Sequence, residues 1–398
     1  MLALGAVAFV PTTNNDINTS ITTHIEDLSG AGPVDGLINL NVTAVNELLL
    51  LSTTGSVNSA PGLDSWDAST IFGFDPDDNG LGSNTNGMFS ELFDLDLFAS
   101  NASVDALHFV SQDISVGTGS GINLLAGDGL FSVSADITLT NSDLTTLDVK
   151  KEDVVIFRPD VAGDYSTGSF SLLFSNPSGN NIESITLAEE ETLVGDIVIQ
   201  AGSFLFTEGS TSIYIFTPDD LSISSSNGNV ERLIDGGEES LYGDGNDIFP
   251  DNIIGIELVE NEYTIAGTTL QAGTLLITTD GNGNVSLSDT QSGKRQDIYA
   301  LNLTQTTLGS GSTDGSVSLF FDGSNVSLNN NSASLNAISF VESQTVANTA
   351  PTGNVVVTGN LTEDQILTAD TSEINDSDGL GSLVISGSGM EPSLVVQQ

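Results

Sequence analysis

The sequence predicts an all-β protein, built as a propeller-like array of about four and a half four-strand repeats. The first observation is a phrase that recurs along the chain: an apolar run that ends in Phe, any residue, and Pro. Strands on both sides of the phrase recur with it, and no segment has the 3.6-residue periodicity of an amphipathic helix. The copies of the phrase are AVAFVP, IFGFDP, VVIFRP and IYIFTP, with IYALNL as a relative that lacks Pro.

Each complete repeat is predicted to hold four strands in a fixed order. The first is an apolar strand that ends in a polar turn, as in GSFLFTEGS from Gly202. The phrase is the second strand, and we expect its Pro to end that strand because Pro cannot donate to a ladder. An alternating strand such as GSFSLLF follows, and a short strand such as VDALHFV closes the repeat. Four short strands per repeat is typical of a propeller blade, and a tandem array of small β-sandwiches is the alternative.

The repeats and their flanks divide the chain into seven segments. The first copy of the phrase begins at residue 6, so the opening segment holds only part of a repeat. Closure of a ring then requires either a strand from the last repeat or a chain that begins further upstream. The predicted segments are a partial repeat at 1–46, four repeats at 47–110, 121–188, 194–259 and 270–341, a linker at 342–353, and a different segment at 354–398.

Composition excludes several classes of function. The chain has 54 Asp and Glu against 6 Lys and Arg, a formal net charge of −48. Nucleic acid and anionic lipid are bound through clustered Lys and Arg, so we expect neither as a partner. The absence of Cys excludes disulfides, thiolate zinc sites and Cys nucleophiles. No apolar run approaches the ~20 residues of a membrane-spanning helix, so no membrane insertion is expected.

The character of the sequence changes at Asn348. The segment NTAPTGNVVVTGNLTEDQILTADTSEINDSDGLGSL resembles the opening of the tandem immunoglobulin-like or cadherin-like modules of giant bacterial surface adhesins, many of them RTX-type. The resemblance implies an extracellular or cell-surface bacterial location, with neighbouring modules of a longer chain as partners. It stops after Leu383, where such modules continue with a Tyr-Gln-Trp strand. We interpret this as a truncation or frameshift, and expect 354–398 to be poorly ordered because about 50 residues are too few to close a sandwich.

Calcium is the cofactor that the sequence favours. The run Asp75-Pro76-Asp77-Asp78-Asn79-Gly80 matches the start of a calcium loop, with oxygen ligands at alternate positions around a Gly turn. Position twelve is Asn86 rather than Glu, and a plain turn is the alternative in a chain rich in Asp and Asn. Bound cations would also screen the large negative charge. The predicted ligands are Asp75, Asp77 and Asn79, together with Asp376 and Asp378, which the resemblance places at a junction between modules.

Catalytic signals are weak. The two imidazoles, His24 and His108, lack an accompanying nucleophile elbow, so we assign His108 to strand packing. Trp66 lies in a predicted loop as a candidate sugar-stacking platform. Four polar residues share one place in the closing strand and are predicted to make a structural hydrogen bond to a neighbouring loop: Asp35, Asp105, Glu183 and Asn336.

The sequence therefore predicts a structural or adhesive segment of a secreted or cell-surface bacterial protein, stabilised by calcium and without enzymatic activity. Two alternatives remain open. A carbohydrate-binding propeller would place an aromatic cluster at one end of the repeats. A propeller-type glycoside hydrolase or lyase would bring acids with perturbed pKa values together on the central axis.

Overall fold

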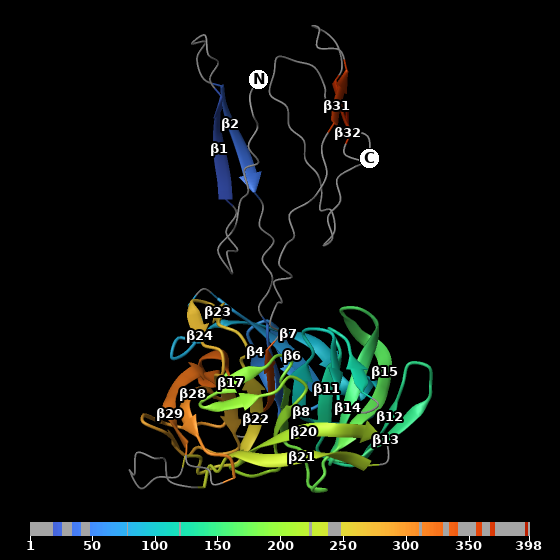
Figure 1. Cartoon of the computed structure of the whole chain (residues 1–398), viewed down its shortest axis with the longest axis vertical. Helices are drawn as coiled ribbons and strands as arrows, with labels where there is room; N and C mark the ends of the chain where they lie inside the picture. The colour runs from blue at the N-terminus through green and yellow to red at the C-terminus, as the bar shows by residue number, and fades with distance from the viewer. Residues whose placement is uncertain are drawn as a thin grey trace. The chain divides into compact units, whose positions relative to one another are not determined.

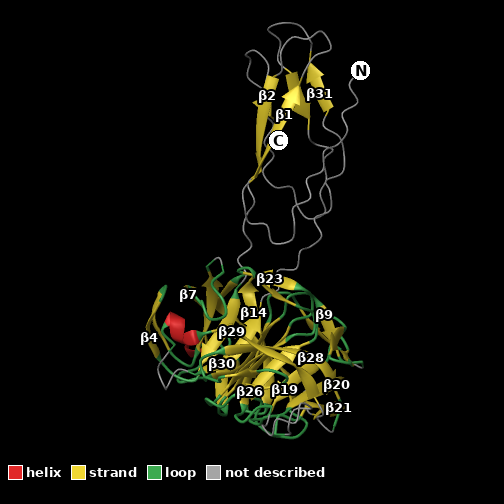
Figure 2. Ribbon diagram, turned by 90° about the vertical axis from the view of Figure 1, so that its left-hand side faces the viewer, coloured by secondary structure: helices red, strands yellow, loops and turns green. Residues whose placement is uncertain are grey.

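The computed structural model of the chain forms two compact units, which are described separately. One unit spans Asn46–Ser343, and the other combines Met1–Val45 with Gln344–Gln398. Nearly all regular structure in the described residues is β-strand, with short 3-10 turns at Leu95–Leu97 and Gly323–Val326 (Figure 2). The residues that the structure describes are 19–25, 34–40, 48–77, 79–118, 121–222, 225–237, 248–309, 313–328, 334–340, 356–359, 367–370 and 395–396.

The larger unit consists of four antiparallel sheets of four strands, arranged like a four-bladed β-propeller (Figure 1). We number the sheets as blades I to IV and give each from its innermost to its outermost strand. Blade I is β30 (Leu335–Phe340), β3 (Leu49–Thr53), β6 (Thr70–Pro76) and β7 (Gly87–Asp94). Blade II is β8 (Val104–Phe109), β11 (Gly129–Val133), β14 (Asp153–Val161) and β15 (Asp164–Ser175). Blade III is β16 (Ser184–Leu187), β19 (Phe204–Thr207), β20 (Ile213–Ser222) and β21 (Ser225–Ile234). Blade IV is β22 (Ile253–Leu258), β25 (Leu275–Thr279), β28 (Ile298–Thr306) and β29 (Thr313–Phe321).

The ring is closed by the last repeat. Each sequence repeat contributes three strands to one blade, and its closing strand becomes the innermost strand of the next blade. The closing strand of the fourth repeat, β30, returns to pair with β3, so four repeats complete four blades. The partial repeat predicted at 1–46 contributes no described strand to these sheets. Its closing-strand sequence forms β2 (Val34–Leu40), which pairs with β1 (Thr19–Ile25).

The hydrophobic cores lie between blades, as a ring requires. Each of four buried clusters is shared by two neighbouring blades, including one that joins blade IV back to blade I. In β11, for example, Leu130 packs into the core shared with blade III, whereas Phe131 packs into the core shared with blade I. Successive side chains of a strand point to opposite faces, so the inner strands are apolar on both sides. This arrangement excludes independent small sandwiches for the described part of the chain.

The recurring phrase is the third strand of each blade, and its Pro does not always end that strand. β6 ends at Pro76, but β14 and β20 continue beyond Pro159 and Pro218 after a shift in register. The reason is the length of the second strand: β11 pairs with β14 only as far as Phe157. Because Pro159 lies beyond that point, its missing N–H costs no ladder bond on the inner side.

A glycine in the outermost strand lies opposite the end of the phrase in every blade. A Cβ on Gly168 would lie 2.5 Å from the carbonyl oxygen of Arg158 and 2.5 Å from the ring of Phe157. The Phe ring therefore covers the glycine, and no larger residue fits without displacement. The cross-strand pairs are Pro76 with Gly87, Pro159 with Gly168, Pro218 with Gly228, and Leu303 with Gly315.

Hydroxyl side chains in the second strand connect three of the blades to the next one. Each donates to a backbone carbonyl at or just before the start of the neighbouring inner strand. The bonds run from Ser52 Oγ to Val104 O (3.4 Å), from Ser132 Oγ to Ile182 O (2.6 Å) and from Thr207 Oγ1 to Ile253 O (2.9 Å). These bonds link each of blades I, II and III to the blade that follows it.

Small hairpins decorate the blades. Those that follow an innermost strand are β9 (Ile114–Val116) with β10 (Ile122–Leu124), β17 (Thr192–Val194) with β18 (Ile197–Ile199), and β23 (Tyr263–Ile265) with β24 (Thr268–Leu270). Those that follow a second strand are β4 (Val57–Ala60) with β5 (Leu63–Trp66), β12 (Ile137–Thr140) with β13 (Thr146–Val149), and β26 (Val285–Ser286) with β27 (Thr290–Gln291). In the smaller unit, β31 (Val356–Gly359), β32 (Leu367–Asp370) and β33 (Val395–Val396) form one three-stranded sheet.

Candidate functional site

Of the ligands predicted in the calcium loop, Asp75 lies near the end of β6, Asp77 and Asn79 follow before β7, and all three are exposed. Partial burial raises the pKa of Asp75, and the nearby negative charge of Asp77 raises it further. Asn79 extends toward the β23–β24 turn, because a Cβ on Gly267 would lie 2.6 Å from its Oδ1. Within the described part of the chain, no three His, Asp or Glu side chains are grouped to hold a metal ion. Asp376 and Asp378 lie outside the described residues.

Asp75 occupies the variable position between Phe and Pro of the phrase. In the other three blades, the side chain at this position is hydrogen-bonded. That position hydrogen-bonds to the residue just before the second strand, in the pairs Arg158–Asp128, Thr217–Ser203 and Asn302–Thr274. The Arg158 pair is bidentate, at 2.8 Å and 2.6 Å. In blade I the corresponding residue is Leu48, which has no polar side-chain atom, so Asp75 is left facing solvent.

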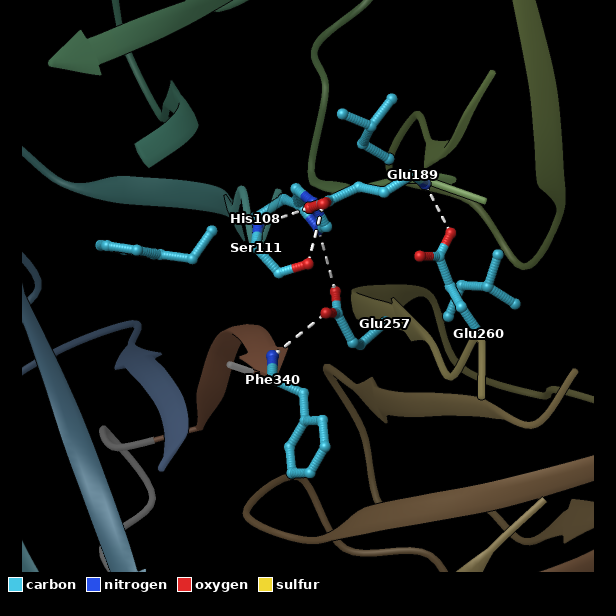
Figure 3. Close-up of a pocket in the computed structure, with 9 residues that line it drawn as sticks. His108, Ser111, Glu189, Glu257, Glu260 and Phe340 are labelled. Carbon is cyan, nitrogen blue, oxygen red and sulfur yellow. Dashed lines mark hydrogen bonds and ion pairs between the residues drawn. The ribbon is translucent and has the colours of Figure 1, made fainter. Parts of the chain in front are cut away.

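The main cluster of chemistry-bearing side chains in the described structure lies on the propeller axis, around His108 (Figure 3). His108 is on β8, and its imidazole reaches two carboxylates from other blades. Nε2 lies 3.2 Å from Oε1 of Glu189, which follows β16, and Nδ1 lies 3.4 Å from Oε2 of Glu257 on β22. All three side chains are at least nine-tenths buried. The contacts of His108 with Glu189 and Glu257 therefore connect blades II, III and IV.

The acids keep His108 in its charged form. Burial by itself would lower its pKa, but the charge of Glu257 and the hydrogen bonds to Glu189 and Glu257 outweigh it and raise the pKa of His108 to about 10. For Glu189, burial would raise the pKa, but the hydrogen bond and charge of His108 and the bonds from Ser111 lower it overall. The cluster is thus a buried imidazolium between two carboxylates.

One position of the inner strand supplies a polar side chain to the axis in all four blades: His108, Thr186, Glu257 and Ser339. In three blades this side chain accepts a hydrogen bond from a backbone N–H of the next inner strand. The bonds are Leu258 N to Thr186 Oγ1 (3.3 Å), Phe340 N to Glu257 Oε1 (3.1 Å) and Phe109 N to Ser339 Oγ (3.0 Å). The innermost strand has no ladder partner on its axial side, so these N–H groups need side-chain acceptors.

A second set of acids caps the loops that follow the inner strands. Glu189 accepts from the backbone N–H of Ser111 (2.7 Å) and of Gln112 (2.8 Å), in the loop after β8. Glu260 accepts in the same way from Glu189 (2.5 Å) and Glu190 (3.0 Å), one blade further on. The repetition shows that these carboxylates serve as links between blades.

Little space remains inside the cluster. The cavity lined by His108, Ser111, Glu189, Glu257 and Glu260 has a volume of about 10 Å³. That is roughly the space of one water molecule, so a sugar or peptide does not enter it.

At the other end of the axis, the polar position of the closing strands meets the predicted loop only in part: Asp105 accepts from Asn181 in the loop before β16, whereas Asn336 bonds to the neighbouring inner strand. The side chain of Asp35 lies outside the described part of the chain. Asn336 donates to Val104 O (2.6 Å) and to Asp105 (3.2 Å). Asn181 donates to Asp105 (3.0 Å) and to Glu183 (3.4 Å). Burial raises the pKa of both acids, and for Glu183 the charges of Asp105 and Asp280 raise it further. Two acids with raised pKa values therefore share one amide here.

Trp66 does not form a sugar platform. It lies on β5 with 5% of its surface exposed, and its ring packs against Phe72 and Phe89. Its indole N–H donates to Thr53 Oγ1 at 3.0 Å. The expected loop tryptophan is thus part of the core between blades I and IV.

The sequence predicted that His108 packs within a strand, but it did not indicate Glu189 and Glu257 as its partners.

No family model matches the chain, and comparison with curated proteins and with solved structures gives no significant match. In the part of the chain that the structure describes, no helix has the length and apolar character needed to cross a membrane.

Proposed function

We propose that the propeller is a structural, non-catalytic module of a secreted or cell-surface protein, used for presentation or adhesion. The observation that carries this proposal is the use of the axial polar groups. His108, Glu189, Glu257 and Ser339 are committed to bonds between blades, around a cavity of about 10 Å³. The net charge of −48 favours solubility and separation from other acidic surfaces. Adhesion would then use the outer surface of the ring.

A binding and turnover screen of the full chain tests this proposal. We expect retention of a glycan or a cell-surface protein without chemical change of the ligand. Multiple turnover of any glycan in the same screen would contradict a non-catalytic role, and binding of neither class would limit the module to presentation.

A glycoside hydrolase or lyase is the second candidate, favoured by Asp105 and Glu183. Glycoside hydrolases use a pair of carboxyl groups, one of them with a raised pKa, for general acid and base catalysis on the glycosidic bond. If this candidate holds, Asp105→Asn and Glu183→Gln each abolish turnover. Asp297→Asn is the matched control, because it removes another buried carboxyl whose pKa is raised, to about 6, by burial and by Asp322. Turnover that survives both axial substitutions would exclude the pair.

Calcium stabilisation is a prediction for the loop that holds Asp75 and Asp77. A ligand that binds only the folded state raises its stability, so we expect a higher melting temperature in calcium than in chelator. The difference should disappear in Asp75→Asn/Asp77→Asn and persist in Asp164→Asn, which changes an exposed acid at the start of β15. Equal melting temperatures in calcium and chelator would contradict the prediction.

A further inference from the structure

Both ends of the propeller lie at the same end of one strand pair. The chain enters the ring at β3 and leaves it at β30, and Leu49 is the cross-strand partner of Phe340. Opposite residues of an antiparallel pair are about 5 Å apart. Tension along the chain therefore reaches the ring through two neighbouring residues.

This geometry loads the hydrogen bonds of the pair one after another. Pulling Leu49 and Phe340 apart opens the ladder from that end, toward the partners Thr53 and Leu335. Pulling the opposite ends of the two strands would instead load every bond at once. β30 leaves first, because it pairs with β3 alone, whereas β3 is also held by β6.

Loss of β30 opens the whole ring. This strand contributes Leu335, Ile338 and Phe340 to the core between blades I and IV. It also contributes the axial bonds of Asn336 and Ser339 to β8. Without the strand, two cores and the axis are exposed to water together, so the remaining blades lose their support.

We propose that the β3–β30 pair is a tension-sensitive clasp, which opens under load along the chain and releases the length stored in the four blades. The proposal rests on the proposed function, because a chain that takes part in adhesion comes under tension when the attached surfaces are pulled apart. About 290 residues lie between Leu49 and Phe340, and at 3.3–3.6 Å per extended residue they release about 1,000 Å.

Glu257 holds the loaded end of the clasp. Its Oε1 accepts from the backbone N–H of Phe340 at 3.1 Å, and its other oxygen faces His108. The Phe340 bond is among the first that tension breaks, since Phe340 is the last residue of β30. The axial ion cluster thus sets the resistance of the clasp.

Force spectroscopy of the full chain, held by its two ends, tests the clasp. The chain has no Cys, so Thr53→Cys/Leu335→Cys introduces one disulfide across the far end of the pair. Reduced protein should extend by about 1,000 Å. Oxidised protein should yield only the roughly 10 residues outside the disulfide, about 35 Å, a loss of about thirtyfold. Equal extensions in the two forms would overturn the proposal.

Two further arms separate a clasp from a merely fragile fold. A handle on Ser332→Cys, just before β30, and one on the N-terminus load the pair from opposite ends, and we expect a higher rupture force. Glu257→Leu removes the acceptor of Phe340 N–H and should lower the rupture force between the native ends. A rupture force independent of the pulling points would overturn the clasp. These results are independent of the binding and turnover screen, so the two proposals fail separately.

Discussion

Replacing His108 by Leu lowers the free energy of unfolding by about 3–5 kcal/mol, because it leaves two buried carboxylates without their counter-charge. Glu189 and Glu257 would then face each other across the axis, with Glu260 on the same cavity. Chemical denaturation at pH 7 measures the loss. His108→Leu/Glu257→Gln is the matched variant: it removes one of the charges but keeps an acceptor for Phe340 N, and should recover part of the stability. A loss below about 1 kcal/mol would contradict an ionic axis.

His108 also makes the free energy of unfolding depend on pH. The folded pKa of His108, about 10, lies above its ordinary value of 6.5. Its contribution to stability is therefore complete below pH 6.5 and is lost as the pH rises through 10. The stability difference between the wild type and His108→Leu should shrink over that interval. A difference that stays constant from pH 6.5 to 10 would show that His108 is neutral in the folded protein.

Gly168→Ala is expected to destabilise the propeller by about 1–3 kcal/mol, through overpacking against the phrase. The new Cβ would meet the Arg158 carbonyl and the Phe157 ring, both at 2.5 Å, and the carbonyl belongs to a ladder that cannot easily move. Thermal or denaturant unfolding measures the effect.

Gly129→Ala in the same blade is the control. Its nearest atom beyond the neighbouring residues lies 3.6 Å away, in the Phe109 ring, which is an ordinary contact. We expect a change within about 0.5 kcal/mol. Equal losses at the two positions would show that the close approach at Gly168 has no special weight.

The repeat made most of the fold predictable. Four copies in one chain act as an internal comparison, so the alternation of β15 and the closing strand of the first repeat, β8, could be recognised without relatives. Blade membership could not be assigned, because periodicity identifies strands and not their neighbours in a sheet. The Pro of the phrase was misread for the same reason: whether a missing N–H matters depends on how far the adjacent strand extends, which the local sequence does not state.

The axial site was predicted only in part. The shared place of Asp105 and Asn336 indicated a structural hydrogen bond to a neighbouring loop, which Asp105 makes with Asn181, whereas Asn336 bonds to the neighbouring inner strand. The partners of His108 are 81 and 149 residues away from it, and in a chain with 54 acids no pattern singles out Glu189 and Glu257. One sequence signal does mark Glu189: it and Glu260 each lie two residues after the end of an inner strand, in two successive repeats.

Ring closure is the central claim, and cysteine cross-linking tests it most directly. Thr53 is paired with Leu335 in β30, whereas Val34 has the corresponding place in the upstream copy of the inner-strand sequence. Oxidation of Thr53→Cys/Leu335→Cys should give a near-complete intramolecular disulfide. Thr53→Cys/Val34→Cys, treated in the same way, should give little. Efficient cross-linking to residue 34 and none to residue 335 would contradict a four-bladed ring closed by its last strand.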